Sequence, residues 1–347
     1  MNTIKSAIEE KRNIKPQTWK TYVRYMNELS KSVTGEDYKD NSFLEDKERV
    51  QSILGGVRED GSPLYGGSKK RVCASIILVF LSPDKAMAPI KRSSKNDPVT
   101  FPEGTSDLYK HYHSIQASLT KDYTDLMALQ TKTDKQAENW VDWKDILKLQ
   151  RKFMNKIRRE KYNKKETLTV GEHKTLQDYL ILSLYTLIKP RRLDYAGLKL
   201  MTNTEYKEYS VEDQKKMNAL VLQSKIKKFF SFGSGAQKNE NGGGLGIYRL
   251  KVPPNLNRVL QLYLKHHSEK FLLFNSRRKG EVTKDGLSKQ IMKIMKEEFD
   301  KKISASMLRT IHNTAFYSGP SLAEKKACAE EMGHSPQTAE LHYTKKN

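Results

Sequence analysis

Apolar and polar residues alternate with the period of an α-helix along most of the chain. Residues 14–33 carry apolar side chains three and four positions apart: Trp19, Tyr22, Tyr25, Met26 and Leu29. That spacing places them on one face of a helix. The same spacing predicts four more helices, over 68–81, 108–129, 140–162 and 173–188. Pro190 ends the last of these, because proline cannot continue a helix, and from Leu256 onward the pattern predicts mostly short helices.

One region has the composition of β-strands instead. Two β-rich runs, Ala219–Phe232 and Gly246–Val252, flank the segment GSGAQKNENGGGLG. They predict a β-hairpin with a long, flexible tip. The glycines do not form a nucleotide-binding loop, because no G-K-[ST] follows and no helix begins there. The predicted fold class is therefore mainly α with a small antiparallel β-sheet.

The chain is long enough, at 347 residues, for two domains. Residues 129–139 are polar and lack apolar periodicity, which predicts a linker. The sequence therefore divides into a helical N-terminal domain over 1–128, a linker over 129–139 and a second domain over 140–347. The second domain is expected to be helical with the one small sheet.

Charge narrows the class of partner. The chain holds 63 Lys and Arg against 41 Asp and Glu, a formal net charge of +22. An excess of that size favours a polyanion such as nucleic acid. The longest apolar run, Cys73–Leu81, is far too short to span a bilayer, and MNTIKSAIEEKRNIK has no apolar core of a signal peptide. We therefore expect an intracellular protein with no membrane partner.

Neither cysteine nor histidine spacing predicts a metal site. Cys73 and Cys328 both stand in apolar contexts, which predicts reduced core thiols. The histidine pairs HYH and KHHS lack a matched third ligand. The sequence contains no H-E-x-x-H motif, no D-x-D motif and no paired carboxylates, so metal-dependent nuclease chemistry has no support. We expect no cofactor and no metal.

Three segments of the second domain hold the residues that are candidates for chemistry. In TLIKPRRLDYAGLKL, Arg191 follows a buried helix and Asp194 can brace its guanidinium. In ISASMLRTIHNTAFYS, Arg309 stands in an apolar helical pattern, where a charge is costly unless it meets a partner or an anion. The end of the chain, EEMGHSPQTAELHYTKKN, places His334 at a turn and Tyr343 nine residues later on a short helix.

The order of these residues resembles that of the tyrosine recombinases, the phage-integrase type of site-specific DNA recombinase. RRLDYAGL is similar to their R-x-x-E-L-x-x-L box, ASMLRTIHNTAF to their H-x-L-R box, and MGHSPQTAELHY to their L-G-H-S-x-x-x-T-x-x-x-Y box. No single box is specific, but the ordered set is. The lysine-rich style and KQAENWVDWKDI look most similar to integrases of large DNA viruses and virophages. The resemblance covers most of 136–347 and, more loosely, the helical first domain.

The resemblance implies a role for each matching residue. Arg191 and Arg309 would clamp the scissile phosphate, and Tyr343 would attack it to form a 3′-phosphotyrosyl link. His334 would hydrogen-bond the phosphate or accept the tyrosine proton. A lysine of the β-rich segment would protonate the leaving 5′ oxygen. Lys225 and Lys227 are both candidates, because alternate residues of a strand share a face, and Lys228 is expected to be solvated.

The sequence departs from the family pattern at one catalytic position. Ser306 stands where the H-x-L-R box usually has histidine. A serine can donate a hydrogen bond to a phosphate oxygen, but it cannot supply imidazole proton transfer. His312, one turn beyond Arg309, is expected to pack or cap rather than to replace it. Only four residues follow Tyr343, which is too few for a helix that docks on a neighbouring subunit. We therefore expect either that subunits couple through other surfaces or that the chain has been shortened.

The resemblance also implies a fold and a partner. It predicts a SAM-like helical core-binding domain followed by a tyrosine-recombinase catalytic domain, which together would clamp duplex DNA. The chain is expected to be a monomer or weak oligomer when free and a homo-tetramer on DNA, acting in a nucleus, a viral factory or host cytoplasm, or a virion. Basic residues of the first domain would contact DNA phosphates: Lys15, Lys20, Arg24, Lys69, Lys70, Arg71, Lys91 and Arg92.

Three other functions share parts of this pattern. A type IB topoisomerase uses the same chemistry to relax supercoils, although the G-H-S…T…Y box is more like that of recombinases. A non-catalytic DNA-binding protein could keep the fold, and Ser306 is the main point in favour of this alternative. A telomere-resolving relative of the recombinases is the third alternative, although such proteins usually carry additional domains. The expectation is a recombinase that integrates DNA of a viral genome.

Overall fold

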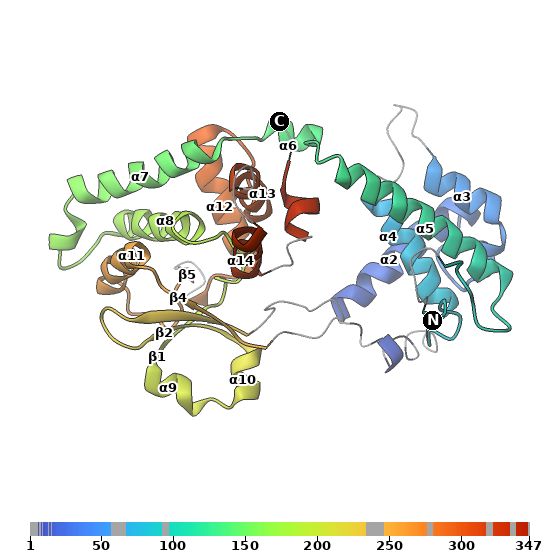
Figure 1. Ribbon diagram of the computed structural model, residues 1–347, viewed down its shortest axis with the longest axis horizontal. Coiled ribbons are helices and arrows are strands. Elements are labelled where there is room, and N and C mark those ends of the chain that lie inside the picture. The colour runs from blue at the N-terminus through green and yellow to red at the C-terminus, as the bar shows by residue number, and fades with distance from the viewer. Residues whose placement is uncertain are drawn as a thin grey trace. The chain divides into compact units, whose positions relative to one another are not determined.

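The computed structural model describes residues 6, 8, 10–12, 14, 16–56, 67–91, 97–233, 246–275, 280–316, 322–333 and 338–345. The chain forms two compact units, residues 1–128 and 129–347 (Figure 1). The assignment of the first unit to DNA binding and of the second to catalysis stays a prediction.

Helices form the first unit. They are α2 Pro16–Thr34, η1 Ser42–Glu45, α3 Lys47–Gly55, α4 Gly67–Leu81 and α5 Asp107–Ala128. The predicted periodicity is confirmed, since Met26 and Leu29 of α2 are fully buried against residues of α3, α4 and α5. The hydroxyl of Tyr112 donates a hydrogen bond of 2.7 Å to the carbonyl of Leu44, which satisfies the polar end of a buried aromatic side chain.

The second unit is also mainly helical. Its helices are α6 Asp134–Glu138, α7 Trp143–Arg159, η2 Tyr162–Lys164, α8 Val170–Thr186, α9 Asn203–Glu208, α10 Val211–Lys216, α11 Pro254–Lys265, α12 Lys284–Phe299, α13 Ala305–Phe316, α14 Leu322–Met332 and the single wide turn η3 Ala339–Tyr343. Every residue of α8 from Leu176 to Tyr185 is buried. A helix that is buried on every side lies at the centre of a domain, and α8 packs against α7, α11 and α12.

The sheet is mixed rather than wholly antiparallel. Its order is β1-β2-β3-β4, with β1 Lys199–Thr202, β2 Asn218–Leu222, β3 Lys228–Phe232 and β4 Tyr248–Lys251. The three later strands pair antiparallel, but β1 pairs parallel with β2. Parallel pairing needs a crossover connection, and α9 and α10 supply it. The predicted class, mainly α with a small sheet, is confirmed; a two-stranded sheet, β5 Phe274–Asn275 with β6 Gly280–Glu281, adds to it.

The first β-rich run is two strands, not one. β2 and β3 pair from Asn218↔Phe232 to Leu222↔Lys228, with a tight turn over 223–227. Ser224 stabilises this turn, because its hydroxyl accepts hydrogen bonds from the backbone N–H groups of Ile226 and Lys227. The predicted hairpin with the long tip is the β3–β4 pair. Its tip, 234–245, lies outside the described residues.

Both faces of the sheet are covered. Leu220 and Phe230 point into the main core with α8, whereas Ala219 and Val221 pack with Tyr206 of α9 on the other side. Side chains alternate between the two faces of a strand, so a run of consecutive buried residues, such as 218–221 of β2, needs cover on both faces. In Figure 1, α8 and α9 lie on opposite sides of the sheet.

The segment predicted as a linker is partly helical. Residues Asp134–Glu138 form α6, which a capping box between Thr133 and Gln136 opens. The side chain of Asn139 accepts a hydrogen bond of 2.7 Å from the backbone N–H of Lys302, so this stretch packs on the second unit. Sequence analysis missed the helix because one turn is too short to show apolar periodicity.

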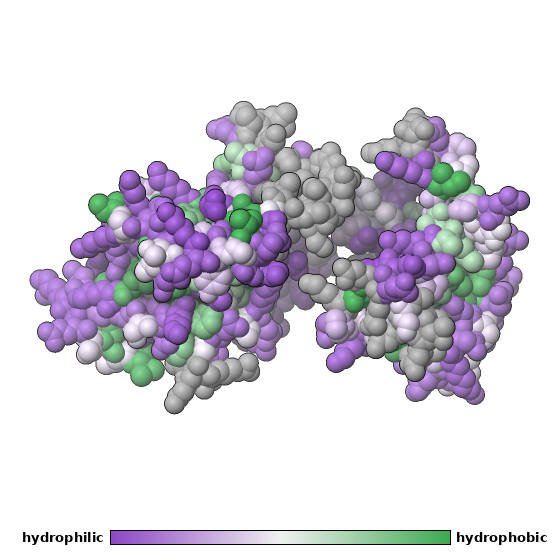
Figure 2. Space-filling model, turned by 90° about the horizontal axis from the view of Figure 1, so that it is seen from below, coloured by the Kyte–Doolittle hydropathy of each residue, from purple (hydrophilic) through white to green (hydrophobic). Residues whose placement is uncertain are grey.

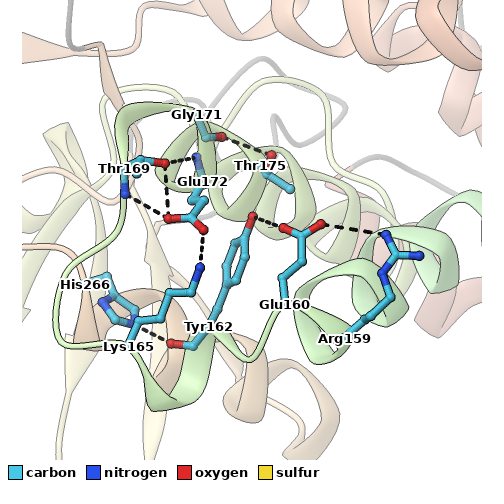
Figure 3. Close-up of polar contacts among 9 residues, drawn as sticks. All are labelled: Arg159, Glu160, Tyr162, Lys165, Thr169, Gly171, Glu172, Thr175 and His266. Atoms are coloured by element: carbon cyan, nitrogen blue, oxygen red, sulfur yellow. Dashed lines mark hydrogen bonds and ion pairs between the residues drawn. The ribbon is translucent and has the colours of Figure 1, made fainter.

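Polar contacts fix the connection between α7 and α8 (Figure 3). Glu172 caps α8 through Thr169 and forms an ion pair with Lys165. The Tyr162 hydroxyl donates 3.1 Å to the carboxylate of Glu160, and the ring of His266 contacts the Tyr162 carbonyl at 3.1 Å. Since His266 is the residue that follows α11, the cluster ties the end of α7 to both α8 and α11.

Hydrophilic residues cover most of the face seen in Figure 2, and apolar residues form small separate patches there. No helix in the described part of the chain has the length and apolar character needed to cross a membrane. Cys73 and Cys328 are buried and unpaired, as predicted, and burial raises the pKa of both thiols, to about 12 and about 11.

Candidate active site

Arg191 is the most deeply buried charged residue of the site, with 1% of its surface exposed. It follows α8 after a short loop, and its guanidinium lies over the ring of Phe232 with Cζ 4.2 Å from the ring centroid. Nε donates a hydrogen bond of 2.7 Å to the carboxylate of Asp194. Nη1 donates a hydrogen bond of 2.5 Å to the backbone carbonyl of Glu331 at the end of α14. The ion pair with Asp194 that the sequence predicted is formed.

Gly333 makes room for Arg191. A Cβ at this position would lie 2.8 Å from Nη2 of Arg191, closer than real contacts allow. Gly333 also has a φ of +77°, a left-handed conformation that glycine adopts at no steric cost. Both features are needed because the chain turns sharply at the end of α14 directly against the buried guanidinium. His334, the next residue, lies outside the described residues, so its place in the site stays a prediction.

Arg309 lies in the middle of α13 and is 4% exposed. Nη2 donates a long hydrogen bond, 3.4 Å, to the carbonyl of Met332. Nε is buried and has no hydrogen-bond partner among the described residues. An unpaired donor on a buried cation carries a large desolvation cost, so this edge of the guanidinium is suited to an anion.

Tyr343 meets Arg309 directly. Nη1 of Arg309 donates 3.1 Å to the Tyr343 hydroxyl, and Cζ lies 4.4 Å from the centre of the tyrosine ring. The contact is made because η3 packs against α13. Gln130 adds a further contact, donating 3.0 Å to the carbonyl of Glu340 in η3. The two segments that sequence analysis connected, 34 residues apart, are therefore adjacent.

The two arginines repel each other electrostatically. Burial lowers the pKa of Arg309 below its usual value; Tyr343 and Asp194 raise it, and the charge of Arg191 lowers it further. The guanidinium nevertheless stays protonated, because arginine is not deprotonated in proteins. Two buried positive charges with one braced carboxylate, Asp194, leave the site with an excess of positive charge. A phosphate would neutralise it.

Ser306 and His312 flank Arg309 on the same helix. Ser306 is exposed in the first turn of α13. His312 is buried, with its ring 4.9 Å from that of Trp143 and 5.7 Å from that of Phe316. Burial lowers the pKa of His312 to about 4, so the ring is neutral at neutral pH. His312 therefore packs, as expected, and does not supply the imidazole missing at Ser306.

Lys225 and Lys227 are not brought to Arg191. Both are exposed in the β2–β3 turn rather than on a strand. Arg191 contacts Phe232 at the opposite end of β3. The four residue steps from Lys228 to Phe232 span about 13 Å at the usual strand rise of about 3.3 Å. Their catalytic role stays a prediction.

The expectation that Lys228 is solvated is wrong. It is 5% exposed, and its ammonium donates 2.6 Å to the carbonyl of Lys225 and 2.7 Å to the side chain of Asn257. Because β3 begins at this residue, strand alternation turns its side chain inward beneath the exposed turn. Burial lowers its pKa. Lys228 thus anchors the turn that carries Lys225 to α11.

Several basic residues of the first unit already have partners. Lys69 forms an ion pair of 2.9 Å with Glu28, and Arg24 lies 3.9 Å from the same carboxylate. Arg71 lies over the ring of Tyr123, with Cζ 4.5 Å from its centre. Lys20 and Lys91 are exposed and Lys70 is half-buried. Lys15 and Arg92 lie outside the described residues. Contact of this set with DNA stays a prediction.

Sequence reasoning missed two residues that shape the site. Gly333 was noted only as a turn, although its contact with Arg191 decides how close α14 can approach. Glu331 holds the loop before Arg191, because its carboxylate accepts a hydrogen bond of 3.1 Å from the backbone N–H of Lys189. Neither role leaves a signal in the sequence. Among the described residues no group of histidines, cysteines and carboxylates is placed to hold a metal ion.

Comparison with known proteins finds similarity to solved structures. No protein-family model matches the chain, and a search of curated proteins found no match. The chain is similar to the crystal structure of a XerA recombinase, with 13% sequence identity, a TM-score of 0.35, and coverage of 100% of this chain and 94% of that chain. A likeness at that TM-score places no residue of the site, and the function has to be argued from the residues themselves.

Proposed function

We propose that the chain is a tyrosine recombinase, which cuts and rejoins duplex DNA through a phosphotyrosyl intermediate. The observation that carries the proposal is the pairing of Arg309 with Tyr343. A buried guanidinium with an unpartnered Nε stands 3.1 Å from a tyrosine hydroxyl, and a second buried arginine lies close enough to repel it. Because Nη1 of the same guanidinium holds the hydroxyl, an anion bound by Arg309 would lie near the tyrosine oxygen.

The chemistry follows from that placement. The Tyr343 oxygen attacks the phosphorus, a Tyr–O–P bond forms, and the bond from phosphorus to the 5′ oxygen breaks. The negative charge that builds on the phosphoryl oxygens is stabilised by Arg309 and Arg191, whose forks match phosphate geometry. The phosphodiester energy is kept in the tyrosyl ester, so a 5′ hydroxyl can reverse the step without ATP. His334 would exchange the proton of the tyrosine or bind the phosphate.

The group that protonates the leaving 5′ oxygen is the least defined part of the proposal. Lys225 and Lys227 remain the candidates, although about 13 Å of strand separates their turn from the residue that contacts Arg191. Single alanine variants of both, with Lys238 of segment 234–245 as the comparison, would assign the role. A 5′-bridging phosphorothiolate substrate needs no proton on its leaving group and should restore the rate of only the variant that lacks the acid.

Covalent trapping tests the proposal. Wild type and Tyr343→Phe would be incubated with a pool of nicked duplexes, without metal or ATP, and denatured before electrophoresis. An adduct in wild type alone supports the proposal. Arg309→Lys should lower adduct formation by about 10²-fold or more, because a lysine cannot form the bidentate contact. An equal adduct from Tyr343→Phe would refute it.

The finer assignments belong to the same proposal. Integration of a viral genome, a tetramer on DNA and action on DNA inside a host cell rest on the likeness of the ordered boxes to integrases of large DNA viruses. Strand exchange between two duplexes would distinguish recombination from relaxation of a supercoiled circle, the reaction of a type IB topoisomerase. Salt-sensitive binding without any adduct would instead favour a DNA-binding protein on the same fold.

A further inference from the structure

A groove of about 360 Å³ lies between α7, α8 and α11, and none of its lining residues belongs to the candidate active site. Its floor is apolar, with Met154 and Ile157 of α7 and Val259 of α11. Three arginines line it: Arg151 and Arg158 from α7 and Arg258 from α11. The three helices are neighbours in Figure 1, and α8 packs against both of the others.

All the charged side chains that line this groove are positive. No carboxylate stands among the described residues that line it. Arg151 and Arg158 form no ion pair within the described part of the chain, and Arg258 contacts only the neutral side chain of Asn255. A larger groove of about 930 Å³ between α7 and α12 shares Arg151 and Arg158 with this one. It differs because Glu297 and Glu298 also line it, and Glu298 pairs with Lys152 at 2.5 Å.

The helices that carry the three arginines are tied to one another, and the arginine side chains themselves are exposed. The polar contacts of Figure 3 tie the end of α7 to the start of α8 and the end of α11. Tyr179 of α8 is 5% exposed between them; burial raises the pKa of its hydroxyl, and the charges of Arg158 and Arg258 oppose that effect. Both guanidinium groups are therefore close to one buried phenol, from opposite sides of the groove.

The spacing fits a phosphodiester backbone. Arg151 and Arg158 are seven residues apart on one helix, which is about 10.5 Å at about 1.5 Å per residue. Guanidinium groups that far apart can reach two different phosphates of one strand, whose residues rise about 3.4 Å each along the DNA axis. Guanidinium forks match phosphate geometry better than ammonium groups do. We propose that the groove between α7, α8 and α11 binds the phosphate backbone of nucleic acid at a second place, apart from the active site.

This goes beyond the proposed function, because a chain with two such sites holds a second nucleic-acid segment while the first lies at Tyr343. The test is a bridging assay with the full-length Tyr343→Phe chain, which cannot form an adduct. One duplex is immobilised and saturated with protein, and capture of a second, labelled duplex is measured. The groove variant carries Arg151→Gln, Arg158→Gln and Arg258→Gln.

The matched control removes the same charge elsewhere in the second unit, with Lys207→Gln, Lys215→Gln and Lys216→Gln on α9 and α10, all exposed. The groove variant should capture at least about tenfold less second duplex, and its salt slope should fall by up to about 2.7, since each phosphate contact contributes about 0.9. The control should stay within about twofold of the parent. Equal losses in both variants would mean that net charge alone acts and would overturn the proposal.

Competitors identify the ligand chemistry. A single-stranded oligonucleotide should displace the second duplex, whereas polyglutamate or inorganic phosphate at equal ionic strength should not. Displacement by polyglutamate as readily as by the oligonucleotide would overturn the nucleic-acid assignment in favour of an acidic protein segment. Failure of this proposal can be distinguished from failure of the proposed function. Groove substitutions in a chain with Tyr343 intact should still allow the covalent adduct. Bridging stays measurable in Tyr343→Phe, which forms no adduct.

Discussion

Replacing Gly333 with alanine tests whether the turn after α14 is built around Arg191. The new methyl group would lie 2.8 Å from Nη2 and 3.3 Å from Cζ of Arg191. The guanidinium cannot move away easily, because Asp194 holds it at 2.7 Å and the carbonyl of Glu331 at 2.5 Å. The φ of +77° adds a strain of about 1–2 kcal/mol for any residue with a Cβ.

The contact with Arg191 adds to that strain. Moving the guanidinium off its rotamer costs about 0.5–1.5 kcal/mol, and a lost hydrogen bond to a buried charge costs about 1–3 kcal/mol. We expect Gly333→Ala to lower the free energy of unfolding by about 2.5–6.5 kcal/mol in total. A shift of about 1 Å in Arg191 should also slow adduct formation about 10²-fold.

Gly246→Ala is the matched control. Gly246 is in the same unit and has a φ of +81°, but a Cβ there would meet nothing within 4 Å. This variant should be destabilised only by the backbone strain of about 1–2 kcal/mol, and it should react at the wild-type rate. Urea unfolding followed by tryptophan fluorescence, with single-turnover adduct formation beside it, measures both effects. Identical stabilities and rates for the two variants would refute the close approach of Gly333 to Arg191.

Three further predictions follow from the buried polar residues. Asp194→Ala should destabilise the chain by about 3–5 kcal/mol, because it leaves Arg191 buried and unpaired, and Asp194→Asn should lose less; urea unfolding measures both. The pKa of Lys228 is lowered from its usual 10.5 by burial, so the wild type should gain stability as pH rises towards 10.5, and Lys228→Met should lack that gain in unfolding at several alkaline pH values. The pKa of His312 is lowered to about 4, so stability should fall by up to about 3 kcal/mol as pH drops from 6.5 to about 4; His312→Phe should not show this fall, and equal acid sensitivity would contradict it.

Local pattern predicted the parts of the fold that depend on one segment at a time. The periodicity of α2 and α7 marked their buried faces, and the apolar run of α8 marked a buried helix. The apolar neighbours of Arg309 marked it as a buried charge. The pair of Arg191 with Asp194 could also be anticipated, because three residues of a turn separate them. These features are visible in the sequence because each is fixed by neighbours along the chain.

Features that depend on distant segments could not be predicted. The turn between β2 and β3 has no glycine or proline; Ser224 and backbone hydrogen bonds make it, so the run was interpreted as one strand and Lys228 as solvated. The parallel pairing of β1 depends on a crossover through α9 and α10. The approach of Gly333 to Arg191 joins segments about 140 residues apart, and nothing local to either residue signals it.

Identifying the residue that carries the DNA tests the central claim most directly. The covalent adduct would be isolated, treated with nuclease and digested with trypsin, which releases the peptide Ala327–Lys345 with Tyr343 as its single tyrosine. Mass spectrometry should find a nucleotide remnant on Tyr343. A remnant on any other residue, or no adduct from a chain that still binds the same duplex, would contradict the assignment of Tyr343 as the nucleophile.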